Sequence, residues 1–226
     1  MLDVNVYSPL IKTPSFITFK DFDGIQSSNF YVKPTMCNLN CYHCHNKHGY
    51  KNEPFLTWNE LQKKLSMLSM MKVECVIVSG GEPTLLPWKT LEKLFEFIRE
   101  NFSGIIRLDT NGTNPEVIQK LFDFQLIDSV AIDIKIPLDV EIDETNLSRY
   151  SMILFSKPEV EKEIIQNYQK KVSQSIDIAE YYSDINLYRT VKYPFFTNDD
   201  LNRIKEFVNQ LGLKHQFNEF VPVKGK

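Results

Sequence analysis

The stretch "ECVIVSGGEPTLLPWKTLEKLFEFIRENFSGIIRLDTNG", residues 74–112, decides the fold. Its first part (74–81) is a short apolar run that ends in two glycines, a pattern typical of a buried strand. Its middle part (88–101) carries apolar residues at helical spacing on one face, and its last part (104–112) is a second apolar run that stops at Asn-Gly. A strand, a helix and a strand in this order predict two parallel strands joined by a crossover helix.

The same alternation continues on both sides of this stretch. Further strands are predicted at 27–35, 128–137, 185–194 and 214–223, and further helices at 57–71, 114–124, 159–176 and 197–212. Thr57 and Glu60 fit a capping box at the start of the first of these helices. Residues 138–157 have no clear period, so we expect a loop or an insertion there. About six strand–helix units predict an α/β fold, an incomplete (β/α)6 barrel with parallel strands and outer helices, because eight units close a full barrel.

The composition is that of an ordinary globular protein. With 226 residues, the chain is expected to form a single domain over residues 1–226. The formal net charge of −3 does not indicate a nucleic-acid-binding surface, which would usually be strongly basic. The N-terminus lacks a basic segment followed by a long apolar run, and no apolar stretch is long enough to span a bilayer. We therefore expect a cytoplasmic protein with neither a signal peptide nor a membrane partner.

Polar and glycine-rich segments follow several of the predicted strands directly. They are Gly80-Gly81, Asp109-Thr110-Asn111 and the segment from Asp133 to Lys135. In parallel α/β folds, chemistry gathers at the carboxyl ends of the strands, which lie at one edge of the sheet. We therefore expect these segments to converge there with a loop that holds three cysteines.

This cysteine loop, "MCNLNCYHCHN" at residues 36–46, contains three of the four cysteines of the chain. Cys37, Cys41 and Cys44 could lie on one face of a helix that buries small apolar side chains. The two asparagines between the first cysteines are poor helix formers, however, and the loop lacks the other core residues that such a helix would need. The spacing therefore favours a metal centre.

Two kinds of metal centre fit the cysteine loop. A zinc site would need His45 or His48 as a fourth ligand, and the second Cys-x-x-Cys pair of a usual zinc knuckle is absent. An iron–sulfur cubane is usually held by four thiolates, so three thiolates leave one iron open for a substrate or cofactor. Cys75 lies within an apolar run and is expected to be an ordinary core residue. Because cytosolic thiols stay reduced, clustered cysteines there indicate metal or redox chemistry and not structural disulfides.

Two motifs carry a resemblance to a known family. The segment "CNLNCYHC" (37–44) is similar to the C-x-x-x-C-x-x-C signature of the radical S-adenosylmethionine (SAM) enzymes, and "SGGEPTL" (79–85) resembles the glycine-glycine-glutamate segment that follows their second strand. The resemblance implies one 4Fe–4S cluster whose open iron is chelated by the amino and carboxylate groups of SAM. It also implies that an electron from the cluster cleaves the sulfonium and releases a 5′-deoxyadenosyl radical.

Further stretches resemble the small activating proteins of anaerobic ribonucleotide reductases, over about residues 15–222 and with no second domain. They are "CYHCHN", "SGGEPTL", "RLDTNGTNPEVIQKL", "AIDIKIPL", "YRTVKYP" and "HQFNEF". The resemblance implies that the radical removes a hydrogen atom from a backbone glycine of a partner, the reductase, which is a glycyl-radical enzyme. It also implies a flavodoxin-type or ferredoxin-type electron donor.

Three alternatives remain open. A radical SAM enzyme could act on a small molecule, as the 7-carboxy-7-deazaguanine synthase does, or on another protein or peptide. A different class is a non-catalytic zinc-binding or cluster-binding module.

The resemblance assigns roles position by position. The catalytic cluster ligands are Cys37, Cys41 and Cys44. The residue before the last cysteine is usually aromatic and packs near the adenine, and here it is His43, a departure from the family pattern. The residues that would meet the methionyl amino group are Gly80, Gly81 and Glu82, and the glycines would let the backbone approach the ligand without a Cβ in the way.

The remaining assignments concern charged and polar residues after the later strands. Asp109, Thr110 and Asp133 resemble a polar cluster beside the cofactor carboxylate that holds a monovalent cation in related activases. Lys135 and Arg189 are the positive partners expected for that carboxylate, with ion pairs to Asp133 or Asp109 as the alternative. Asn111 is counted with these cofactor-binding residues, and a simple turn at Asn111-Gly112 is its alternative.

Overall fold

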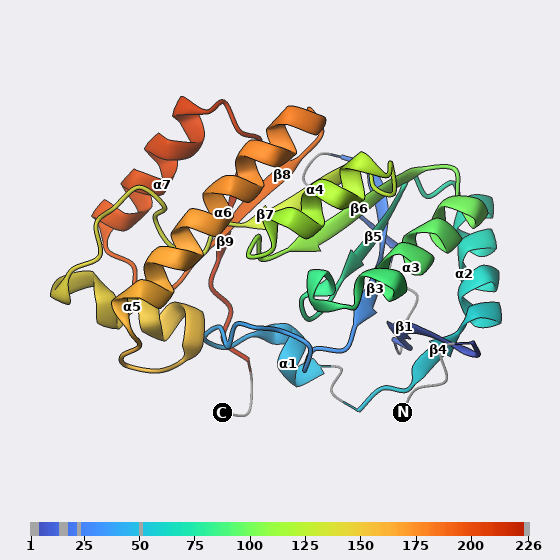
Figure 1. Ribbon diagram of the computed structural model, residues 1–226, viewed down its shortest axis with the longest axis horizontal. Coiled ribbons are helices and arrows are strands. Elements are labelled where there is room, and N and C mark those ends of the chain that lie inside the picture. The colour runs from blue at the N-terminus through green and yellow to red at the C-terminus, as the bar shows by residue number, and fades with distance from the viewer. Residues whose placement is uncertain (1–4, 14–17, 22–23, 50–51, 224–226) are drawn as a thin grey trace.

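The computed structural model describes residues 5–13, 18–21, 24–49 and 52–223, and they build one large, mostly parallel sheet (Figure 1). The strands are β1 (Tyr7–Ile11), β2 (Thr18–Lys20), β3 (Gln26–Val32), β4 (Phe55–Thr57), β5 (Cys75–Ser79), β6 (Ile105–Thr110), β7 (Ser129–Asp133), β8 (Leu187–Lys192) and β9 (His215–Glu219). Their order is β4-β1-β3-β5-β6-β7-β8-β9, with β2 paired to β3. Every neighbouring pair from β3 to β9 is parallel.

The connections between the parallel strands are mostly helical. The helices are α1 (His45–Gly49), α2 (Trp58–Met70), α3 (Trp88–Asn101), α4 (Pro115–Asp123), α5 (Glu144–Phe155), α6 (Lys162–Tyr182) and α7 (Asn198–Gln210), with a short 3-10 turn at Pro83–Leu85. In Figure 1, the helices α2, α3, α4, α6 and α7 form a row outside the sheet. The predicted incomplete barrel of parallel strands with outer helices is confirmed.

The N-terminal part of the sheet was not predicted. Strands β1, β2 and β4 extend it beyond β3, and they pair antiparallel. Two of them, β2 and β4, have only three residues each, too few to show a periodic pattern. The capping box that was predicted at Thr57 and Glu60 is confirmed, and it begins α2 directly after β4.

The prediction of a loop or insertion at 138–157 was wrong for most of that segment, because it contains the helix α5. Asp143 caps the helix at its N-terminus, and Ser156 ends it in the left-handed conformation. The face that α5 buries includes the polar residues Asn146 and Ser151 beside apolar ones. This mixture hides the helical period from a reading based on hydrophobicity.

The two faces of the parallel strands differ in polarity, because side chains alternate along a strand. One face belongs to the hydrophobic core with the outer helices, and Val76, Leu108 and Val130 on it are fully buried. The other face becomes charged toward the carboxyl ends of the strands, where Asp109 and Asp133 lie. The sheet therefore presents polar groups at the edge where a site was predicted.

His215 in β9 should make the fold sensitive to acid. Its Nε2 lies 2.9 Å from Thr190 Oγ1, and the Thr190 hydroxyl donates to Ile134 O at 2.8 Å, so Nε2 donates to Thr190. Burial lowers the pKa of His215 from 6.5 to about 4, because it disfavours a second proton on the ring. A pKa below that of the unfolded chain means that this stabilising contribution is complete above pH 6.5 and is lost as the pH falls toward 4.

We expect this residue alone to lower the free energy of unfolding by about 3 kcal/mol over that pH range. His215→Gln keeps a donor for Thr190 and should remove this part of the acid sensitivity. Urea unfolding of both proteins at several pH values measures the difference. An equal loss of stability in the variant would show that other groups cause it.

Candidate active site

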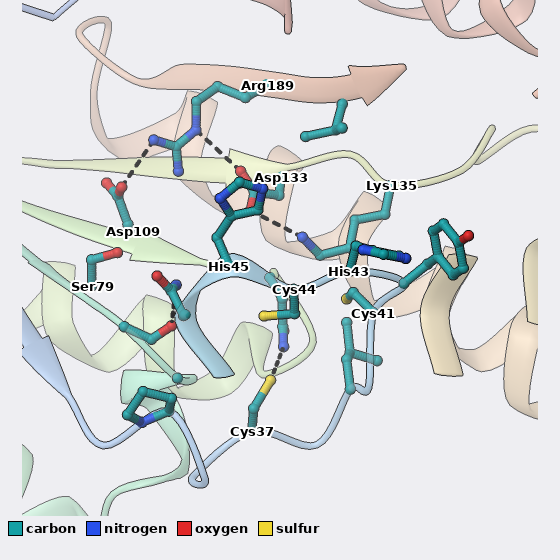
Figure 2. Close-up of a pocket in the computed structure, with 18 of the residues that line it drawn as sticks. Cys37, Cys41, His43, Cys44, His45, Ser79, Asp109, Asp133, Lys135 and Arg189 are labelled. Atoms are coloured by element: carbon teal, nitrogen blue, oxygen red, sulfur yellow. Dashed lines mark hydrogen bonds and ion pairs between the residues drawn. The ribbon is translucent and has the colours of Figure 1, made fainter. Parts of the chain in front are cut away.

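A cavity of about 340 Å³ lies at the carboxyl ends of the parallel strands. It brings together all but one of the residues proposed from the sequence, namely Cys37, Cys41, His43, Cys44, Gly80, Gly81, Asp109, Thr110, Asn111, Asp133, Lys135 and Arg189. The exception, Glu82, does not line it. Figure 2 shows the three cysteines on one side of this cavity and the charged residues of β6, β7 and β8 on the other.

The cysteine loop is held in place by the last turn of α5. The backbone N–H groups of Asn40 and Tyr42 donate to Leu154 O at 2.9 Å and to Ile153 O at 3.0 Å. The last carbonyls of a helix have no partner within the helix. These two bonds therefore give partners both to carbonyls at the end of α5 and to N–H groups of the loop. The segment that showed no period in the sequence therefore supports the loop that carries the thiols.

A closed ring of side-chain hydrogen bonds holds the first part of the loop against β6. Asn38 Nδ2 donates to Thr113 Oγ1 at 2.8 Å, and Thr113 Oγ1 donates to Asn111 Oδ1 at 2.7 Å. Asn111 Nδ2 completes the ring with a 2.9 Å bond to Asn38 Oδ1, and it lies 3.9 Å from Cys37 Sγ. Asn111 is thus part of a network at the thiols and not merely a turn residue.

The thiols of Cys37 and Cys41 are buried enough to be protonated when no metal is bound. Burial raises the pKa of Cys37, and it raises the pKa of Cys41 to about 12, while the nearby charge of Lys135 acts in the opposite direction on Cys41. Cys44 is within electrostatic reach of both. A metal centre supplies the positive charge that makes such thiolates stable, and binding then releases their protons. Three neighbouring thiols beside a cavity fit an iron–sulfur cluster.

The zinc alternative finds less support in this geometry. Among the described residues, no group of three or more His, Cys, Asp or Glu side chains is placed to hold a single ion. One ring nitrogen of His45, Nε2, is taken up by Val221 O at 2.6 Å. The side chain of His48, the other proposed ligand, lies outside the described residues.

Gly80 and Gly81 are required by close contacts within the protein, whether or not a ligand is bound. Gly80 has a φ of +112°, and a Cβ on it would lie 2.4 Å from Val32 O. A Cβ on Gly81 would lie 2.4 Å from Met36 O and 2.5 Å from Lys33 O. Gly80 thus lets the turn after β5 pack on the end of β3, and Gly81 lets it pack on the start of the cysteine loop. In both cases the close approach is one between two segments of the protein.

Glu82 is fully buried beneath the cavity and fastens two strand ends together. Its Oε1 accepts bonds from Thr84 Oγ1 at 2.6 Å and from Thr110 Oγ1 at 2.7 Å, and its Oε2 accepts one from Asn111 N at 2.7 Å. Burial raises the pKa of Glu82 even with these donors present. The side-chain oxygens of Glu82 are thus turned toward β6, and its contact with an amino group in the cavity stays a prediction.

Six residues of alternating charge form what we call the charge chain, and the last four of them line the cavity. In order they are Asp21, Arg107, Asp109, Arg189, Asp133 and Lys135, and the five bonds between them measure 2.5, 3.1, 2.9, 3.1 and 3.0 Å. Figure 2 shows Arg189 bridging Asp109 and Asp133, with Lys135 beyond. Arg107 is fully buried and was not proposed from the sequence, where it stands within an apolar run.

The charge chain changes the expectation of a monovalent cation. Burial opposes the charge of Arg189, but the carboxylates of Asp109 and Asp133 raise its pKa above the ordinary value. Burial likewise works against Asp133, yet Lys135 and Arg189 lower its pKa. The three cations of the charge chain balance its three carboxylates, so charge balance does not require a further cation between Asp109 and Asp133. Ion pairing was the alternative considered for Lys135 and Arg189, and it matches these contacts.

Replacing Arg189 by glutamine should destabilise the fold by about 2 kcal/mol, because it leaves the buried carboxylate of Asp109 and the partly exposed carboxylate of Asp133 with one cation each. The matched control is Lys192→Gln on the same strand. Lys192 pairs with Glu219 where both side chains are well exposed, so its loss should cost less than about 1 kcal/mol. Urea unfolding at pH 7 compares the two. Equal effects would mean that the charge chain contributes no more than a surface ion pair.

Several cavity residues were missed by the sequence reading. Ser79 is the last residue of β5 and precedes Gly80, so its position at a strand end could have revealed it. Tyr193, Phe220 and Val221 also line the cavity. Tyr193 and Phe220 belong to the quoted segments "YRTVKYP" and "HQFNEF", but no role was assigned to them from the sequence. Only the fold places these residues beside the cysteine loop.

Comparisons with known proteins agree with this geometry. The family model described as "Radical SAM superfamily" matches residues 31–211. The chain is 36% identical over 104 residues to a Methanocaldococcus jannaschii protein named as a glycyl-radical enzyme activating enzyme, which covers 46% of this chain and 41% of that one. It is 27% identical over 210 residues to a Methanococcus aeolicus protein named as a GTP 3′,8-cyclase, which covers 89% of this chain and 62% of that one.

A solved structure shares the fold. "Native anSMEcpe with bound AdoMet" aligns with a TM-score of 0.60 at 19% identity, over 88% of this chain and 54% of the other. The chain thus spans about half of the length of the proteins that it matches. Among the described residues, no helix is long and apolar enough to cross a membrane.

Proposed function

Because the chain belongs to the radical SAM superfamily and therefore binds a 4Fe–4S cluster and SAM, we propose that it is a glycyl-radical enzyme activase that acts on an anaerobic ribonucleotide reductase. One observation carries the proposal: three thiols on a single loop face a cavity whose opposite wall is charged. The similarity to a protein named as a glycyl-radical enzyme activating enzyme supports the activase role. So does the resemblance of the segments around Cys44, Gly81 and Asp109 to those activases.

In this proposal, Cys37, Cys41 and Cys44 hold the cluster. When bound, the cluster and SAM supply a 5′-deoxyadenosyl radical that takes a hydrogen atom from a glycine of the reductase. The chain itself contributes position and shelter, because α5 and the ring around Asn111 fix the thiols. His43, which lines the cavity beside them, is the residue proposed to lie near the adenine.

The wall opposite the thiols would receive the amino acid part of SAM. Arg189 and Lys135 are the cations proposed for its carboxylate, and Gly80 and Gly81 present backbone groups for its amino group. Lys135 and Arg189 both donate hydrogen bonds to Asp133 here. To bind the carboxylate of SAM, they would have to donate to it as well as to Asp133. A flavodoxin-type or ferredoxin-type protein is the proposed electron donor.

A second candidate is a radical SAM enzyme for a small molecule, comparable to a 7-carboxy-7-deazaguanine synthase. One observation favours it: the protein named as a GTP 3′,8-cyclase is similar over most of this chain. The same cysteine loop and cavity would serve such a reaction. The two candidates differ in whether the hydrogen donor is a protein backbone or a free ligand.

The experiment that tests the proposal mixes the anaerobically purified, iron-loaded protein with an anaerobic ribonucleotide reductase, SAM and dithionite. We expect a doublet in the electron paramagnetic resonance spectrum that depends on all of these components and is absent when the glycine of the reductase is replaced by alanine. Production of 5′-deoxyadenosine without any signal on the reductase, but with turnover of a pterin-like or purine-like small molecule, would favour the second candidate.

A further inference from the structure

The segment 220–223, which we call the tail segment, leaves β9 and crosses to the cysteine loop. Figure 1 shows the chain after β9 descending to α1, which lies at the far end of the cysteine loop. Phe220 and Val221 line the cavity. The tail segment therefore runs from the last strand of the sheet to the cysteine loop, along one side of the cavity.

Two histidines of the cysteine loop hold the main chain of the tail segment. His45 Nε2 lies 2.6 Å from Val221 O, and Val223 N lies 3.2 Å from His43 Nδ1. A carbonyl can only accept and an amide N–H can only donate, so His45 donates and His43 accepts. The hydrogen bonds of the two rings to the tail segment thus involve one acceptor and one donor of the backbone.

The spacing of these contacts is that of a strand edge. In an extended chain, the C=O of one residue and the N–H of the second residue after it point to the same side. The partners in the tail segment are two residues apart, and so are His43 and His45. Pro222 between the two partners has no N–H to lose, and it favours an extended conformation for Val221 before it.

Only one side chain of the tail segment is firmly held. The ring of Phe220 stacks on Tyr42 at 5.7 Å and lies 5.9 Å from Tyr193 and 5.8 Å from His43. The side chain of Val221, by contrast, is mostly exposed. The arrangement therefore selects an aromatic residue followed by an extended backbone of almost any sequence.

We propose that His43, His45 and the aromatic cage of Tyr42 and Tyr193 form a binding site for the extended main chain of a polypeptide substrate, and that the tail segment occupies this site in the free enzyme. The inference rests on the proposed function and deepens it. A glycine has no side chain by which it can be positioned, so an enzyme that acts on one must hold the backbone on either side of it. Such a substrate would displace the tail segment to reach the cavity.

The test keeps the full chain and changes one backbone hydrogen. Val223→Pro removes the N–H that His43 accepts, and Val223→Ala is the matched control that keeps it. The probe is a fluorescein-labelled peptide with the sequence of residues 219–226, EFVPVKGK, measured by anisotropy under anaerobic conditions. We expect the peptide to bind the Val223→Pro protein about fivefold to tenfold more tightly than the wild type or the Val223→Ala protein, because only in the first does the tail segment lose a hydrogen bond to the site.

Two further arms test what the site recognises. Methylation of the Val223 nitrogen in the peptide should weaken binding about fivefold to tenfold, the range of one hydrogen bond, and so should His45→Ala in the Val223→Pro protein. A synthetic peptide that spans the radical glycine of an anaerobic ribonucleotide reductase should compete with the labelled peptide.

Equal binding of the methylated peptide, or no binding to the Val223→Pro protein, would overturn the site. Binding of the labelled peptide without competition by the glycine peptide would overturn the substrate assignment and leave the tail segment as an internal strap. Both results are independent of the radical signal on the reductase, so a failure here can be told apart from a failure of the proposed function.

Discussion

Replacing Cys41 by alanine should reduce the formation of 5′-deoxyadenosine from SAM by at least about 100-fold, since even residues that only support a metal ligand commonly contribute 10–100-fold. The fold should remain, because the neighbouring backbone bonds of Asn40 and Tyr42 to α5 do not involve the thiol. Leu39, which is buried in the core, also anchors the loop independently of the metal. Activity and structure are therefore expected to separate in this variant.

The measurements are the yield of 5′-deoxyadenosine with dithionite, the iron content, and circular dichroism. Cys75→Ala is the matched control, because Cys75 is a buried cysteine of β5 that lies in the core and does not line the cavity. It should cost about 1–2 kcal/mol of stability with cofactor cleavage retained. A Cys41→Ala protein that formed 5′-deoxyadenosine at the parent rate would remove Cys41 from the ligands.

Gly81→Ala should cost about 3 kcal/mol and displace the cysteine loop. The new Cβ would lie 2.4 Å from the backbone oxygen of Met36, the residue directly before Cys37. A Cβ is fixed by its own backbone, and a backbone oxygen cannot rotate away as a side chain can. The bond from Glu82 N to Met36 O, at 2.6 Å, shows how closely the two segments are packed. We expect the iron content to fall along with the stability.

Gly104→Ala separates these two effects. A Cβ there would lie 2.5 Å from Glu74 O, a collision of the same kind, but Gly104 precedes β6 at the opposite end of the sheet from the cavity. The two variants should therefore lose similar stability, measured by urea unfolding, while only Gly81→Ala loses iron. Iron retained at the parent level in Gly81→Ala would mean that the turn after β5 does not position the loop.

Much of the fold could be predicted because its signals are local. The strands β5 and β7 are short apolar runs, β6 begins as one, and most of the outer helices carry a clean apolar stripe. The helix α5 was missed because Asn146 and Ser151 lie on its buried face, and β2 and β4 are too short to show alternation. Local patterns therefore fail where the buried face is polar or the element has only three residues.

Cavity residues could be predicted where a polar side chain stands at the carboxyl end of an apolar strand, as Asp109 and Asp133 do. The site could not be predicted where contacts join distant parts of the chain. The pairing of Arg107 with Asp21 links residues that are 86 positions apart, and His43 meets Val223 over 180 positions. Glu82 belongs to a recognisable motif, but only the structure reveals that its oxygens are turned toward β6.

The last turn of α5 has an electrical consequence for the cysteine loop. A helix carries about half a negative unit charge at its C-terminus, and the carbonyls of Ile153 and Leu154 direct that end at the backbone on both sides of Cys41. Negative potential disfavours the addition of an electron to a nearby centre and so lowers its midpoint potential. By its orientation alone, α5 would make a cluster on this loop a stronger reductant, which is what the cleavage of a sulfonium demands.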